Sequence, residues 1–99
     1  GRKVPLDYKE ALKWYRLAAE QGYAYAQYFL GWMYAEGEGV PEDYASAHMW
    51  WNICGSGWQG SQWTHEDCVK KRDIIEKKMS PSQIQKAQEM AKNWKPSYR

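Results

Sequence analysis

The chain has 99 residues, enough for one small domain, and its 14 basic and 12 acidic residues leave a net charge of +2. Because charges of both signs are interspersed, the sequence lacks the basic patch expected of a partner for nucleic acid or an anionic membrane. No apolar run approaches the roughly 18 residues of a membrane span. The opening GRKVPLDYKE has no hydrophobic signal region, so we expect either no export or an export signal outside this sequence.

The first expected element is a helix that opens at Pro5 and Asp7, ends at Gly22, and has Tyr8, Ala11, Tyr15 and Ala18 on its apolar face. A second helix is predicted from about Ala24 to Glu36. The third begins near residues 41–43 and stops at Gly55. No stretch alternates with period two for long enough to predict a strand.

Two further helices are expected after a Gly/Ser-rich loop. The fourth is predicted from an N-cap at Thr64 to about Met79. The fifth has the stronger start signal, with Ser80 as N-cap, Pro81 at the first helical position and Gln83 closing the capping box. It ends before Pro96, which gives five helices in up-and-down order.

A shift of 36 residues superimposes the first helix on the third. The matched pairs are Gly1 and Gly37, Val4 and Val40, Pro5 and Pro41, Asp7 and Asp43, Tyr8 and Tyr44, Ala11 and Ala47, and Trp14 and Trp50. A period in the thirties is typical of stacked helix pairs.

Residues 10–52, EALKWYRLAAEQGYAYAQYFLGWMYAEGEGVPEDYASAHMWWN, resemble the Sel-one-like repeat family, an α-solenoid related to the tetratricopeptide repeat. The later stretch KKRDIIEKKMSPSQIQKAQEMAKNW resembles the helical cap that follows the last repeat. The resemblance implies an all-α, right-handed solenoid of about two repeats plus capping helices. It further implies one domain over residues 1–99, with an inserted loop at 55–64, a cap helix at 80–95, and an adaptor or scaffold role rather than catalysis.

The resemblance places Cys54 and Cys68 where the first repeat has Ala18 and Ala26, at a close crossing of two helices. A cysteine-rich branch of the family bridges these positions, which implies a disulfide here across an inter-helix turn enlarged by six residues. Two reduced thiols, or a metal site with His65 as a third ligand, are the alternatives. A native disulfide predicts a periplasmic or secreted protein, because such bonds persist in oxidising compartments.

Seven tryptophans and eight tyrosines accompany a single phenylalanine, and Trp and Tyr suit half-buried or partner-binding surfaces. Two groups of them are candidates for a binding site. On the second helix, the face beside the expected core residues Ala26, Leu30 and Met33 carries Tyr25, Phe29 and Trp32, with Tyr23 adjacent. The resemblance places that face on the concave surface of the solenoid. In the loop, the candidates are Trp58, Gln59, Gln62 and Trp63, expected to be presented to a partner.

Each candidate has a structural alternative. An aromatic stripe at helical spacing is more often core, and a Gly/Ser-rich loop is more often a solvated linker. Trp14, Trp50 and Trp51 match core or near-core positions of the family, so we expect them to pack. His48 is expected to be a packed or partly exposed histidine without a catalytic role.

No nucleophile and base at motif spacing, phosphate-binding loop or metal motif is evident, so we expect no enzyme, cofactor or metal. The sequence predicts a non-catalytic scaffold that binds a protein or peptide through the aromatic groove and the disulfide-pinned loop. A small-molecule or glycan pocket walled by the same aromatics is the alternative. The uncovered first helix suggests a homodimer. The insertion, the Gly/Ser punctuation and the abrupt start suggest an engineered or excised scaffold, although natural repeats also carry insertions.

Overall fold

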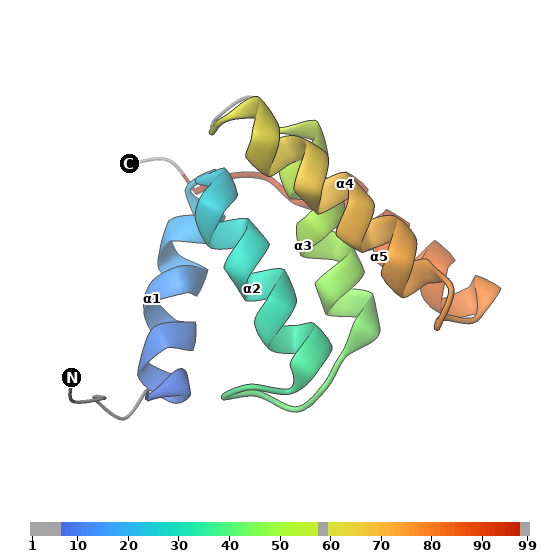
Figure 1. Ribbon diagram of the computed structural model, residues 1–99, viewed down its shortest axis with the longest axis horizontal. Coiled ribbons are helices and arrows are strands. Elements are labelled where there is room, and N and C mark those ends of the chain that lie inside the picture. The colour runs from blue at the N-terminus through green and yellow to red at the C-terminus, as the bar shows by residue number, and fades with distance from the viewer. Residues whose placement is uncertain (1–6, 58–59, 98–99) are drawn as a thin grey trace.

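The computed structural model describes residues 7–57 and 60–97, and these form five helices without strands. The helices are α1 (Tyr8–Glu20), α2 (Ala24–Glu36), α3 (Tyr44–Ser56), α4 (Gln62–Glu76) and α5 (Pro81–Asn93). The first three alternate in direction and stack side by side (Figure 1). The predicted all-α solenoid is confirmed.

Side chains at the predicted starts of three helices cap those helices, and Ser80 does so as the predicted N-cap. Asp7 accepts hydrogen bonds from the backbone N–H groups of Lys9 (3.1 Å) and Glu10 (3.2 Å), and Asp43 caps α3 in the same way. Ser80 and Gln83 form both bonds of the capping box that opens α5. These side chains satisfy backbone donors that have no partner within the helix, which is why the helices begin where the sequence predicts.

The start of α4 corrects the sequence prediction. The N-cap is Ser61 rather than Thr64: the Ser61 hydroxyl accepts from the Thr64 N–H at 3.2 Å, and Thr64 is buried inside the helix. Gly60, at φ 102°, turns the chain one step before the helix begins. Gln62 and Trp63 therefore lie in the first turn of α4, and α3 extends through Ser56, so the loop expected at 55–64 is shorter than predicted.

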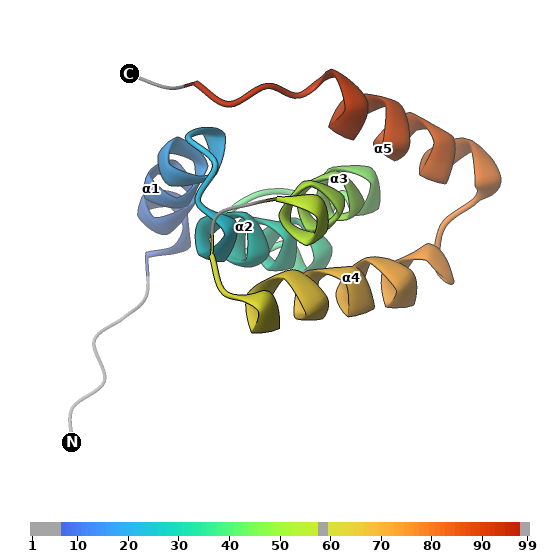
Figure 2. The same cartoon turned by 90° about the horizontal axis from the view of Figure 1, so that it is seen from above.

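The last helix does not continue the stack. Figure 2 shows α3 enclosed between α4 and α5, and α5 packs mainly against α3 rather than α4. Trp94, just after α5, meets Trp50 of α3 edge to face at 5.9 Å between ring centroids. The chain then crosses to α1, where the Ser97 N–H donates to the Glu20 carbonyl oxygen. The C-terminal cap thus covers the outer face of α3.

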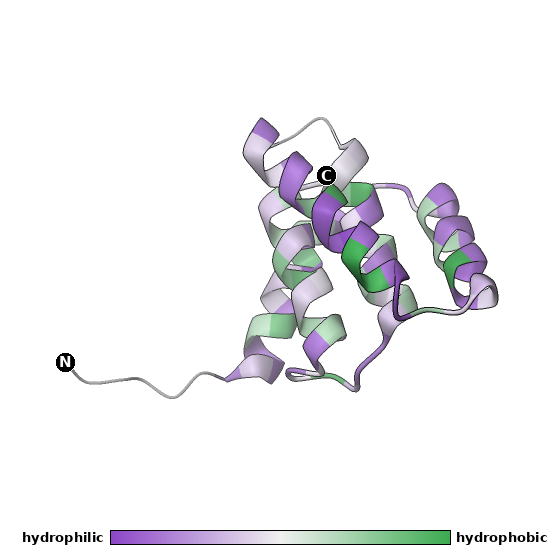
Figure 3. Ribbon diagram, turned by 45° about the vertical axis from the view of Figure 1, so that its right-hand side comes forward, coloured by the Kyte–Doolittle hydropathy of each residue, from purple (hydrophilic) through white to green (hydrophobic). Residues whose placement is uncertain are grey.

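The core consists of two clusters of buried side chains, and α2 and α3 contribute to both. The first extends to α4, and the second extends to α1 and to the end of α5. Leu30, Met33, Trp50 and Trp51 are buried, as expected, and so is Ala26. Hydrophobic and hydrophilic residues alternate along the helices (Figure 3). The central helices α2 and α3 bury the most residues, because each is packed against three other helices.

A close crossing of α2 and α3 depends on Gly31. A Cβ at that position would lie 2.5 Å from Nε1 of Trp51, so only glycine lets the indole lie against the α2 backbone. In that position the Trp51 indole N–H donates to the carbonyl oxygen of Tyr28 at 3.0 Å. The core tryptophan of α3 thereby fixes the part of α2 that carries the candidate site.

Of the two environments expected for His48, packed or partly exposed, the structure shows the packed one. Its side chain is buried, and Nε2 lies 2.7 Å from a carboxylate oxygen of Glu76. The pair links α3 to α4 near the end of α4 distant from the disulfide.

The prediction that Trp14 packs is wrong. Its side chain is 59% exposed, whereas Trp50, its counterpart one repeat later, is 5% exposed. The difference arises because α5 covers the outer face of α3, while no described helix covers the same face of α1. Trp14 instead lies along its own helix, where its indole N–H donates to Glu10 at 3.1 Å.

Within residues 7–57 and 60–97, no helix combines the length and apolar character needed to cross a bilayer.

Candidate functional site

The two cysteines are joined by a disulfide. Cys54 of α3 and Cys68 of α4 are both fully buried, and their Cα atoms lie 5.9 Å apart. The implied bridge is therefore present, and neither sulfur is a free thiol or a thiolate metal ligand. Close by, the His65 ring Nδ1 lies 2.6 Å from the Cys54 carbonyl oxygen. Together these contacts hold the first half of α4 against the end of α3.

Seven aromatic side chains from three helices are here called the aromatic cluster, and their ring contacts form two groups: Tyr8 contacts Trp32, and the other five are linked through Tyr28 and Phe29. The two groups meet at one hollow, which residues of both line. The members of the aromatic cluster are Tyr8 and Tyr15 of α1, Tyr25, Tyr28, Phe29 and Trp32 of α2, and Trp63 of α4. Their sequence separation shows that the cluster is assembled by the fold and not by one helix alone.

Phe29 lies at the centre of the aromatic cluster. Its ring stacks on Tyr15 at 5.4 Å between centroids and meets Tyr25 and Tyr28 edge to face at 4.9 and 5.3 Å. Offset stacking and edge-to-face contacts are the favoured geometries for aromatic pairs, each worth about 0.5–1.5 kcal/mol beyond the area they bury. Phe29 is thus a partly buried side chain packed between other rings. The sequence pattern alone could not distinguish this position from that of an exposed residue in a groove.

Trp63 extends the aromatic cluster onto α4. Its side chain is 63% exposed, and its ring centroid lies 6.4 Å from that of Tyr28. Because it lies two residues after the N-cap Ser61 and five residues before Cys68, the disulfide and the cap fix its position. The expected exposure of this indole is confirmed, although a helix and not a loop presents it.

Burial and a carboxylate of α4 raise the pKa of the Tyr28 phenol. Partial burial raises the pKa of Tyr28 from 10.0 to about 12, helped by a hydrogen bond from its hydroxyl to Asp67 and by the negative charges of Asp67 and Tyr25. On the same helix, the Lys71 Nζ lies 5.9 Å from the centroid of the Tyr28 ring. Tyr28 is therefore a neutral, well-anchored side chain at neutral pH.

Two hollows flank Trp32, so the aromatic surface is not flat. The first, of about 360 Å³, is lined by Tyr8, Ala11, Tyr15, Phe29, Trp32 and Met33. We call it the aromatic cleft. The second, of about 230 Å³, lies between α2, α3 and α4 and is lined partly by Trp32, Trp51, Lys71 and Ile75. The aromatic cleft is lined mostly by apolar groups, and its only polar side-chain groups are two phenol hydroxyls and one indole N–H. Such a lining suits an inserted hydrophobic side chain.

Only some of the predicted site residues lie together in the structure. Tyr25, Phe29, Trp32 and Trp63 belong to the aromatic cluster. Tyr23 is exposed at the N-cap of α2, without an aromatic contact in the described part of the chain. Gln62 is exposed and donates to Glu66 within α4 at 2.8 Å. Trp58 and Gln59 lie outside the described residues.

Sequence reasoning missed three members of the aromatic cluster. Tyr8 and Tyr15 were assigned to the core face of the first helix, but both are only partly buried. Tyr28 was missed although its spacing from Tyr25 and Trp32, at i+3 and i−4, places it on the same helical face. This spacing was the feature of the sequence from which Tyr28 could have been predicted as a member of the aromatic cluster.

Among the described residues, no three His, Cys, Asp or Glu side chains gather in a way that could hold a metal ion.

Comparisons with known proteins agree with this architecture. The model of the Sel1 repeat matches residues 1–23 and 24–53, and the chain belongs to that family. It is similar to chitin synthase regulatory factor 3 of Schizosaccharomyces pombe, with 46% identity over 48 residues. That match covers 48% of this chain and 5% of the yeast protein.

A solved structure also resembles this fold. It is c5321, a protective antigen of uropathogenic Escherichia coli strains that displays an SLR fold, with a TM-score of 0.79 and 33% identity. The match covers 92% of this chain and 18% of that antigen. The chain thus spans a small part of both similar proteins. Sel1 repeats commonly form scaffolds that mediate protein interactions, and membership of the family indicates a repeat of that kind.

Proposed function

We propose that the aromatic cluster is a binding site for a peptide segment of a partner protein. The observation that carries this proposal is the junction of α1, α2 and α4 at one surface, where exposed Tyr25 and Trp63 flank the partly buried Phe29. Aromatic anchors surrounded by fixed neighbours are typical of the residues that dominate protein interfaces.

The aromatic cleft favours a peptide over a glycan. A sugar needs several convergent hydrogen-bonding groups, and the residues lining the aromatic cleft supply few of them. Its volume of about 360 Å³ accommodates one or two hydrophobic side chains. Lys71, beside Tyr28, adds a cation at the edge that could pair with an acidic residue of the peptide.

Preorganisation supports the same proposal. The disulfide fixes α4 against α3, and Trp51 fixes α2 through the Tyr28 carbonyl. Because these contacts order the rings before a partner arrives, less entropy is lost on binding.

The test begins by selecting peptides from a displayed random library against the oxidised protein. Amide hydrogen exchange should then show protection of α2 and the start of α4 when a selected peptide is bound. Phe29→Asn should weaken binding by about tenfold or more while far-ultraviolet circular dichroism shows the helices retained. Unchanged affinity of a folded Phe29→Asn variant would refute the proposal.

A further inference from the structure

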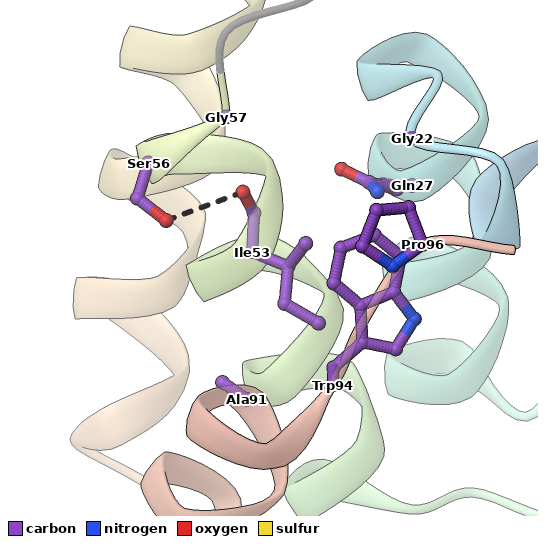
Figure 4. A pocket seen from close by; sticks show the side chains of 8 residues that line it. All are labelled: Gly22, Gln27, Ile53, Ser56, Gly57, Ala91, Trp94 and Pro96. Atoms are coloured by element: carbon purple, nitrogen blue, oxygen red, sulfur yellow. Dashed lines mark hydrogen bonds between the residues drawn. The ribbon is translucent and has the colours of Figure 1, made fainter. Parts of the chain in front are cut away.

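The second hollow beside Trp32, of about 230 Å³, has charged residues in its lining, and we call it the lysine hollow. The aromatic cleft on the other side of Trp32 has no charged lining residue. Neither has the cavity of about 310 Å³ between the turn at Gly22, the end of α3 and the segment with Trp94 (Figure 4). The lysine hollow is lined by Trp32, Ala35, Glu36, Tyr44, Trp51, Lys71, Ile74, Ile75 and Lys78.

The lysine hollow combines an apolar floor with a cationic rim. Ala35, Trp51 and Ile75 are buried, Lys71 is half-buried and Lys78 is exposed. Such a hollow suits a side chain whose methylene stem packs on the floor and whose polar end reaches the rim. Its volume is below the roughly 300 Å³ at which small-molecule pockets begin, so it fits one side chain rather than a whole ligand.

The two lysines of the hollow have no acidic partner in the described part of the chain. The carboxylates on the second half of α4 pair with other groups: Asp73 lies 3.0 Å from Arg72, and Glu76 lies 2.7 Å from the His48 ring. Within residues 7–57 and 60–97, neither lysine of the hollow forms an ion pair. Their charge is therefore available to an anionic group of a partner.

Lys71 connects the lysine hollow with the aromatic cluster. Its Nζ lies 5.9 Å from the centroid of the Tyr28 ring, and the same side chain lines the hollow. Because Lys71 is half-buried, a carboxylate that pairs with it is screened less by water than at a fully exposed lysine. Glu36 of α2 also lines the hollow but is exposed, and two lysines against one glutamate leave the lining positively charged.

On the basis of the peptide site proposed above, we propose that the peptide carries an acidic side chain close to its hydrophobic anchor. The hydrophobic side chain enters the aromatic cleft, and a glutamate or aspartate enters the lysine hollow. The peptide backbone crosses Trp32, which lines both. The carboxylate pairs with Lys71 and Lys78, and this charge complementarity selects the partner and fixes the direction of the peptide.

The test is a selection from a displayed random peptide library, run in parallel on three forms of the oxidised protein. The unaltered chain should enrich peptides that have Asp or Glu near a hydrophobic residue. Lys71→Gln/Lys78→Gln should lose that enrichment. Lys70→Gln/Lys77→Gln is the matched control and should keep it, because the net charge is the same but these two exposed lysines do not line the hollow.

A double-mutant cycle on one selected peptide measures the pairing. Replacing the acidic residue of the peptide by its amide should weaken binding to the unaltered chain by about threefold or more. The same replacement should have little effect on binding to Lys71→Gln/Lys78→Gln, since the partner charges are already absent. An equal loss in both proteins would place the carboxylate elsewhere and overturn the inference.

The remaining outcomes separate this inference from the proposed function. If the selected peptides lack acidic residues but still lose affinity for Phe29→Asn, the peptide site stands and the acidic determinant is refuted. If they bind Phe29→Asn unchanged, both are refuted. Should Lys71→Gln/Lys78→Gln lose its helical circular dichroism, the acid and amide peptides are compared on the unaltered chain. There the advantage of the acid should shrink as salt screens the charges, and no advantage at low salt would overturn the inference.

Discussion

Trp63 of α4 and Tyr28 of α2 lie 6.4 Å apart between ring centroids, although 35 residues separate them in the chain. The contact exists because the Cys54–Cys68 disulfide holds α4 against α3, and α3 in turn holds α2 through Trp51. Loosening the contact between α3 and α4 should therefore also change the geometry of the proposed binding surface.

The first prediction concerns the disulfide. Replacing both cysteines by alanine should lower the free energy of unfolding by about 3 kcal/mol, the value expected for closing a loop near 15 residues. The change in the free energy of unfolding can be measured by urea denaturation monitored by circular dichroism. Reductant should destabilise the original protein and leave the double variant unaffected. An unchanged midpoint in the double variant would show that the bridge contributes little.

The phenol of Tyr28 should stay protonated above the ordinary tyrosine pKa of 10.0. Because burial raises the pKa of Tyr28 to about 12, ultraviolet absorbance compared with a Tyr28→Phe reference should place its ionisation near that value. Asp67→Asn should bring the pKa of Tyr28 closer to 10.0, because it removes the charge but not the burial.

The same shift predicts a pH dependence of stability. Above pH 10 the unfolded chain releases the Tyr28 proton while the folded chain keeps it, so the unfolded state is favoured as pH rises through the window from about 10 to about 12. Tyr28→Phe should flatten the stability profile in this window. An equally steep fall in that variant would assign the effect to other groups.

Gly31→Ala should destabilise the fold by about 1–3 kcal/mol, the usual cost of overpacking. The new methyl would overlap the Trp51 indole, at 2.5 Å from Nε1, and displace the indole that binds the Tyr28 carbonyl. Gly57→Ala is the milder comparison and should cost less, since its added methyl would make only a tight contact, 3.3 Å from the Ile53 carbonyl oxygen, and the backbone φ of −74° suits alanine. Thermal unfolding of the two variants should differ, and equal losses would argue against a special role for Gly31.

Trp14 and Trp50 occupy matching repeat positions and should respond differently to truncation. Trp50→Ala is expected to cost about 3–5 kcal/mol, as for buried aromatics. Trp14→Ala should change the free energy of unfolding by less than about 0.5 kcal/mol, as for exposed positions. Chemical denaturation measures both. A large loss from Trp14→Ala in dilute protein would mean that the indole is covered.

A homodimer through α1 stays a prediction. Exposed Trp14 and Leu17 on α1 are its basis. Light scattering over a range of protein concentrations should detect a mass of two chains that Trp14→Ala reduces to one. A single-chain mass at all concentrations would contradict the dimer.

The sequence predicts the helices and the disulfide better than the binding surface. Caps such as Asp7 and Ser80 act locally, so their positions follow from a few neighbouring residues. Burial of Trp50 but not of Trp14 depends on where α5 packs, and no local pattern specifies that. The start of α4 was misplaced because Ser61 and Thr64 are both acceptable caps and only tertiary packing selects between them.

The most direct measurement is the affinity of a selected peptide for Trp63→Ala and Trp14→Ala. The two indoles are exposed to similar extents, 63% and 59%, but only Trp63 belongs to the aromatic cluster. Fluorescence polarisation of a labelled peptide should show binding weakened about tenfold or more in Trp63→Ala and unchanged in Trp14→Ala. Equal affinities for the two variants would contradict the placement of the binding surface.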